Sequence, residues 1–122
     1  MIRQILIFAG VVITLSSCLK DKTIEPVPPP VDPCLDTVHF NDELLIPLFN
    51  NSCNVSGCHS TEDVAAGRIW VAHDSISANA DEIFLAISHD ASKTPMPYGG
   101  DKLADSLIQK FDCWIQQGKL NN

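Results

Sequence analysis

Apolar residues recur at helical spacing in three stretches of the chain, and polar segments rich in Gly and Pro separate these stretches. The pattern predicts helices from Asn41 to residues 50–52, from Asn79 to about His89, and from about Ala104 to Gln117. Both asparagines are favourable helix caps, and acidic residues follow them in the first turn, where the helix dipole stabilises negative charge. Segments 38–40 and 67–71 read as short extended pieces. We therefore expect an all-α fold of about three helices joined by long loops.

The apolar positions of each predicted helix share one face, as in helices that pack against a common core. These positions are Leu44, Leu45, Leu48 and Phe49 in the first helix, Ile83, Phe84 and Ile87 in the second, and Leu107, Ile108, Phe111, Trp114 and Ile115 in the third. Pro47 lies within the first helix, where it predicts either a kink or a restart. Gly118 is expected to end the third helix.

The first residues have the organisation of an export signal. An apolar run follows Arg3 and is too short to be a comfortable membrane span, so we expect residues 1–17 to be a signal peptide. The run ends in Leu-Ser-Ser before Cys18, which resembles a bacterial lipobox and predicts lipidation of that cysteine. The alternatives are an ordinary signal peptide or a short anchor helix. Lipid would hold the mature chain at a bacterial membrane, facing the periplasm or the cell surface.

Proline shapes the segment that follows. Residues 18–33 include three consecutive prolines, which stiffen a chain toward polyproline II, and we expect a tether there. Residues 34–122 then form one domain, which is what a chain of 122 residues accommodates. The formal net charge of −7 argues against nucleic-acid binding and is compatible with docking onto a basic partner protein.

The sequence Cys53-Asn54-Val55-Ser56-Gly57-Cys58-His59 carries the distinctive chemistry of the chain. Two thiols can add to the two vinyl groups of a haem, and a histidine beside the second thiol can then ligate the iron. The usual spacing is C-x-x-C-H, whereas four residues separate the cysteines here. We expect Cys53 and Cys58 to hold haem c covalently and His59 to be its proximal ligand. The alternative is a Cys53–Cys58 disulfide in a haem-free domain.

Cys34 and Cys113 remain as a pair, and an exported chain meets an oxidising compartment in which such a pair forms a disulfide. On the third predicted helix, Cys113 lies roughly opposite the apolar stripe. This position suits a bridge to a segment outside the helix, and the segment that begins at Cys34 is the candidate.

Met96 is expected to be the second axial ligand of the iron. Two prolines flank it and fix the backbone around it, and ligation by Met and His raises the reduction potential of haem, which suits electron transfer. The rival ligands are His39, His73 and His89, of which His89 is the strongest because it lies close to Met96 in sequence. Three aromatic residues either line a haem pocket or simply form the core: Trp70, Phe84 and Trp114.

This order of motifs resembles the small class I c-type cytochrome domain, and more closely the lipoprotein-anchored cytochrome c-like domains of Gram-negative bacteria. The shared elements are Ile46-Pro47-Leu48-Phe49 before the cysteine motif, Met96-Pro97, and the closing Trp114-Ile115-Gln116-Gln117-Gly118. The resemblance covers about residues 36–122. It implies covalent haem c on Cys53 and Cys58, with His59 proximal and Met96 distal.

We therefore expect a membrane-anchored monohaem cytochrome that passes single electrons to an unidentified redox protein, without a small-molecule substrate or bond chemistry of its own. One alternative is a haem-free, disulfide-stabilised lipoprotein that acts as a binding or structural module. Another is a haem protein with an open distal face, of the peroxidase or gas-binding kind. In so small a domain the haem is expected to be a large part of the core, in a cavity flanked by His59 and Met96.

Overall fold

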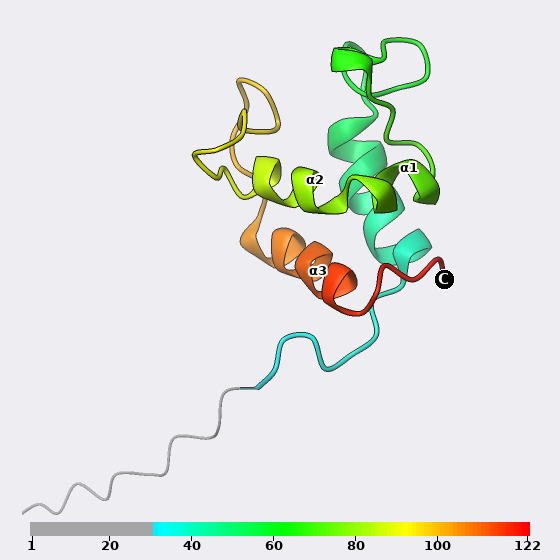
Figure 1. Cartoon of the computed structure of the whole chain (residues 1–122), viewed down its shortest axis with the longest axis vertical. Coiled ribbons are helices and arrows are strands. Elements are labelled where there is room, and N and C mark those ends of the chain that lie inside the picture. The colour runs from blue at the N-terminus through cyan, green and yellow to red at the C-terminus, as the bar shows by residue number, and fades with distance from the viewer. Residues whose placement is uncertain (1–30) are drawn as a thin grey trace, which may run out of the picture.

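The computed structural model of the protein describes residues 31–122, and this part of the chain contains helices and loops but no strand, as predicted. In chain order the helices are η1 (Phe40–Cys53), the single turn η2 (Ala65–Gly67), α1 (His73–Ala78), α2 (Ala80–Ile87) and α3 (Asp105–Gln116), as Figure 1 shows. No helix of this part is both long and apolar enough to cross a bilayer. The predicted signal peptide, the lipidation of Cys18 and the tether up to residue 30 lie outside the described residues.

η1 lies close to its predicted position, although its turns are wider than those of an α-helix. Its bonding is of the π type, and at its end the Asn54 N–H donates to the Phe49 carbonyl, five residues back, at 2.8 Å. At its start the Glu43 carboxylate accepts the backbone N–H of His39 at 2.7 Å, which satisfies one donor of the first turn. The helix runs through Pro47, so the predicted restart does not occur.

α1 is a helix that the hydrophobic pattern did not predict, and it changes the role of Asn79. This residue lies between α1 and α2, and its side-chain amide donates to the Ser75 carbonyl at 2.8 Å, so it closes the end of α1. Asn79 also occupies the N-cap position of α2, as predicted, but its side chain makes no capping bond to that helix. α1 escaped prediction because it is short and polar, with Ile76 as its only fully buried side chain.

α3 ends as predicted. Gly118 follows it with a φ of 90°, in the left-handed region that glycine adopts without a steric penalty. Its N–H donates to the Ile115 carbonyl at 3.0 Å, and the N–H of Lys119 donates to the Trp114 carbonyl at 2.9 Å. These two bonds satisfy carbonyl groups that the last turn would otherwise leave without partners.

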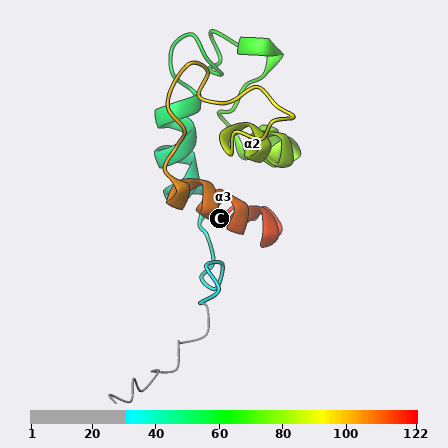
Figure 2. The same ribbon diagram turned by 90° about the vertical axis from the view of Figure 1, so that its left-hand side faces the viewer.

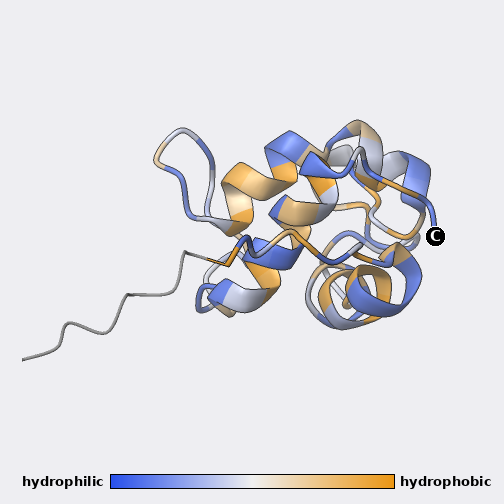
Figure 3. Ribbon diagram, turned by 90° about the horizontal axis from the view of Figure 1, so that it is seen from below, coloured by the Kyte–Doolittle hydropathy of each residue, from blue (hydrophilic) through white to orange (hydrophobic). Residues whose placement is uncertain are grey.

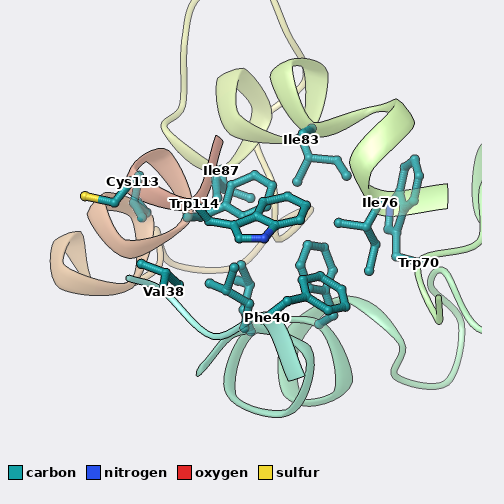
Figure 4. Close-up of a cluster of buried hydrophobic side chains, with 14 residues drawn as sticks. Val38, Phe40, Trp70, Ile76, Ile83, Ile87, Cys113 and Trp114 are labelled. Atoms are coloured by element: carbon teal, nitrogen blue, oxygen red, sulfur yellow. The ribbon is translucent and has the colours of Figure 1, made fainter. Parts of the chain in front are cut away.

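The core lies where η1, α2 and α3 meet, and aromatic rings fill much of it (Figure 4). The ring of Trp114 lies 5.2 Å from that of Phe40 and 5.5 Å from that of Phe111, and Phe111 meets Phe49 at 5.7 Å. All four side chains are fully buried. In Figure 3 each helix combines hydrophobic residues with hydrophilic ones, as its position at the edge of such a core requires.

The helices therefore close on their own side chains at the centre of the domain, and not around a cavity. Trp114, which was a candidate to line a haem pocket, belongs to this core. Cys53 and Met96 pack against the core from outside and are only partly buried. The expectation that a haem forms a large part of the core stays a prediction.

The predicted disulfide between Cys34 and Cys113 is present in the structure and joins residues 79 positions apart. Gln117 reinforces it: its Oε1 accepts the Val38 N–H at 2.8 Å, and its Nε2 donates to the carbonyls of Asp36 and Cys34 at 2.8 and 3.1 Å. The segment before η1 thus covers the outer side of α3. This cover explains why Cys113 is buried although it lies opposite the apolar stripe.

Candidate functional site

The loop after η1 brings the cysteine motif together. Cys53 is the last residue of η1, and its carbonyl accepts the His59 N–H at 2.9 Å. The Cys58 N–H donates to the Val55 carbonyl at 3.0 Å, and Gly57 turns the chain at a φ of 81°. Four residues between the cysteines therefore form a compact turn that returns the second thiol and the histidine to the end of the helix.

Asp63 stabilises this turn, although it belongs to none of the motifs recognised in the sequence. Its carboxylate accepts the Gly57 N–H at 2.8 Å and the Ser60 hydroxyl at 3.1 Å. Asn54 is a second such residue, because its side-chain amide donates to the Trp70 carbonyl at 2.6 Å. Short polar side chains that bond to nearby backbone are common in turns, so neither contact stands out in the sequence.

The two thiols of the motif are free and half-buried. Burial is the main cause that raises the pKa of Cys53 to about 12, and the neighbouring Cys58 adds to it. Cys53 is thus a protonated thiol at neutral pH and a poor thiolate ligand for a metal. The alternative reading, in which the two cysteines form a disulfide with each other, is not the arrangement in the structure.

His59 is oriented by a backbone carbonyl. Its Nδ1 lies 3.1 Å from the Arg68 oxygen, and its ring centroid lies 5.6 Å from that of Trp70. A carbonyl only accepts hydrogen bonds, so Nδ1 carries the proton and Nε2 keeps its lone pair. Metal-binding histidines are commonly held in this way, with the second nitrogen donating to a carbonyl while the first binds the metal.

Met96 is held at both of its backbone polar groups. Its N–H donates to the Ala86 carbonyl of α2 at 3.0 Å, and its carbonyl lies 3.1 Å from Nε2 of His89. Figures 1 and 2 place the loop of residues 90–100 and the loop of the cysteine motif at the same end of the domain, away from α3. The structure thus brings the two sequence-predicted halves of the site to one end of the molecule.

The three rival histidines have different surroundings. His39 is exposed. His73 is structural: its Nε2 lies 2.9 Å from the Lys119 carbonyl, and its ring meets Phe40 edge-on at 5.0 Å. His89 has its Nε2 committed to the Met96 carbonyl. None of the three therefore combines a free Nε2 with a hydrogen bond from Nδ1 to a backbone carbonyl, as His59 does.

Glu82 on α2 joins the two loops of the site by ion pairs. Its carboxylate lies 2.9 Å from Arg68, whose carbonyl orients His59, and 2.7 Å from Lys93 in the loop that leads to Met96. The hydrogen bond from Lys93 is the main cause that lowers the pKa of Glu82, followed by the charge of Arg68. All three side chains are substantially exposed, so each pair is weak in energy, although together they connect separate segments.

A shallow hollow of about 480 Å³ is bordered by Arg68 and Trp70, the two residues that contact His59, but His59 itself does not line it. The remaining lining residues are Ala66, Gly67, Ile69, Ser75 and Asn79. Neither thiol of the motif lines this hollow, and neither does Met96. Within residues 31–122 no group of three or more His, Cys, Asp and Glu side chains gathers as a metal site would require.

Comparison with known proteins adds no relative: no protein-family model, curated protein or solved structure matches the chain.

Proposed function

We propose that the chain is a monohaem c-type cytochrome that carries single electrons, with haem c on Cys53 and Cys58 and with His59 and Met96 as axial ligands. One observation carries the proposal. Two unbridged thiols flank a turn that ends in His59, and a carbonyl holds the Nδ1 of that histidine so that Nε2 is available to a metal. The donor set therefore fits a covalently attached haem, although no ligand is part of the structure.

Covalent attachment of haem requires free thiols, and both Cys53 and Cys58 are free. Each S–H would add across one vinyl C=C bond of a haem: a C–S bond would form, the hydrogen would go to the other vinyl carbon, and no external oxidant or reductant would be needed. Cys53 keeps its hydrogen at neutral pH because burial raises its pKa to about 12. Backbone hydrogen bonds at Cys53 and Cys58 hold the turn that carries both thiols.

The residues at the ligand positions suit electron transfer. When bound, haem supplies a one-electron iron couple, and ligation by Met with His raises its potential. His59 provides a neutral nitrogen whose basicity the Arg68 carbonyl increases. Met96 provides a thioether on a backbone tied at both its N–H and its carbonyl. All of these side chains lie partly exposed at one end of the domain, where a partner protein can approach.

The test is expression of the full chain in a host with haem-attachment machinery. We expect one haem per chain in the pyridine haemochrome spectrum and in the intact mass, with the haem lost from Cys53→Ala and Cys58→Ala. The matched control is the double variant C34A/C113A, which removes two other cysteines and should keep the haem. A folded, colourless wild-type protein would refute the proposal.

A haem-free lipoprotein module is the second candidate, and the closed aromatic core favours it. Phe40, Phe111 and Trp114 fill the centre of the domain without a cofactor, so the chain has a core of its own. The same expression experiment separates the two, since the module would be folded and would carry two alkylatable thiols on Cys53 and Cys58.

A further inference from the structure

We propose that His89 positions Met96 by holding its backbone carbonyl, so that the thioether stays at the iron; this rests on the proposed function. The sequence made these two residues competitors for the same ligand position. The structure shows them in contact, with Nε2 of His89 at 3.1 Å from the Met96 oxygen. Through this contact His89 can hold the backbone of Met96, which a competing iron ligand would not do.

The tautomer of His89 follows from its partner. The Met96 carbonyl only accepts hydrogen bonds, so Nε2 must carry the proton and cannot bind a metal in this arrangement. His89 could ligate iron through Nε2 only after it released Met96. With Nε2 committed to the Met96 carbonyl, His89 is placed to support the methionine, and only its Nδ1 is left without this bond.

The position of His89 in the chain fits such a role. It follows α2 with a φ of 60°, a left-handed conformation that is uncommon for residues other than glycine. In this conformation the Asp90 N–H donates to the Leu85 carbonyl at 3.0 Å, which closes the end of the helix. The imidazole is partly buried and reaches forward over seven residues to Met96. A glycine at position 89 could adopt the same backbone conformation, but it has no side chain to bond to the Met96 carbonyl.

A second backbone hydrogen bond also holds Met96 in place. Its own N–H donates to the Ala86 carbonyl at 3.0 Å, so α2 holds the N–H directly and the carbonyl through His89. The flanking Pro95 and Pro97 have no N–H groups with which to anchor the loop near the methionine. His89 is thus placed to hold the Met96 carbonyl, a group that α2 does not bind through its own backbone.

The test compares side chains of similar size at position 89. His89→Leu fills the space without a donor, whereas His89→Gln keeps an N–H donor. The control is His73→Leu, which removes another partly buried histidine whose Nε2 bonds to a backbone carbonyl, at 2.9 Å, but far from Met96 in sequence. Each protein is made with haem attached, and pyridine haemochrome reports its haem content.

Two kinds of measurement then report on Met96 itself. We expect His89→Leu to weaken or abolish the thioether-to-iron charge-transfer band of the oxidised protein and to lower its reduction potential. We also expect exchange of the Met96 amide hydrogen to become about fivefold faster, the factor for loss of one neutral hydrogen bond of ordinary strength. His89→Gln should restore both, and His73→Leu should change neither while it lowers the melting temperature.

The outcomes separate this inference from the proposed function. A wild-type protein without haem overturns the proposed function and the ligand role of Met96 with it. A haem-loaded His89→Leu protein with an unchanged band and unchanged amide exchange overturns the positioning role alone. If the leucine variant does not fold, His89→Ala repeats the comparison, because a smaller side chain introduces no clash.

Discussion

Removal of the Cys34–Cys113 bond should strongly destabilise the domain. The two cysteines are 79 residues apart, and on the chain-entropy model closure of such a loop restricts the unfolded chain by about 4.5 kcal/mol. The double variant C34A/C113A removes this constraint. Alanine is chosen because serine would place a hydroxyl group in the buried site without a hydrogen-bond partner. A domain of this size loses about 4–8 °C in melting temperature per kcal/mol, so we expect a decrease of about 20 °C or more.

Urea unfolding measures the effect directly. We expect the free energy of unfolding to fall by about 4 kcal/mol and the m-value to rise, because an unfolded chain without the cross-link is less compact and exposes more surface. Gln117→Ala is the matched comparison, since it removes the hydrogen bonds of the same segment and leaves the covalent bond. It should cost about 1–3 kcal/mol. A C34A/C113A protein that unfolds within about 1 kcal/mol of the wild type would show that the unfolded chain is not constrained as argued.

Two further predictions concern the site. Glu82→Gln should reduce the dependence of the free energy of unfolding on pH at acid pH. The pKa of Glu82 is lowered from 4.5 in the folded state. The carboxylate therefore contributes fully to the free energy of unfolding above pH 4.5, and this contribution is lost as the pH falls through the lower folded pKa. Unfolding midpoints are measured from pH 2 to 6 at low and high salt. The midpoint should change less with pH in the variant than in the wild type, and high salt should reduce this difference. An equal change with pH in both proteins would contradict the role of the Glu82 ion pairs. In protein made without haem attachment, Cys53 should react with iodoacetamide at pH 8 about a thousandfold more slowly than free cysteine, because a pKa of about 12 leaves little thiolate. Rapid labelling of Cys53, mapped by mass spectrometry, would show that the thiol is not buried.

The features that the sequence predicted well are those that depend on side-chain pattern. The apolar stripe of α3 and the glycine after it set both the packing face and the end of that helix. The pairing of Cys34 with Cys113 followed from the opposite face of the same helix. α1 was missed because a short polar segment has no such stripe. Asn79 was correctly placed at the start of α2, but its side chain bonds to the preceding helix.

The supporting contacts of the candidate site were beyond prediction for a different reason. The group that orients His59 is the carbonyl of Arg68, and every residue type has a carbonyl, so no sequence signal marks it. The distinction between His89 as ligand and His89 as support depends on which way an imidazole points. Proximity in sequence identified the pair, and the fold was needed to give each member its role.

The covalent ring closed by Cys34 and Cys113 contains every residue proposed to hold the haem. A protease that cuts the chain once between His59 and Met96 would therefore produce two pieces that remain one molecule. One piece would keep Cys53 and Cys58 and the other would keep Met96. On a denaturing gel such nicked protein should migrate as a single species until a reductant separates its halves.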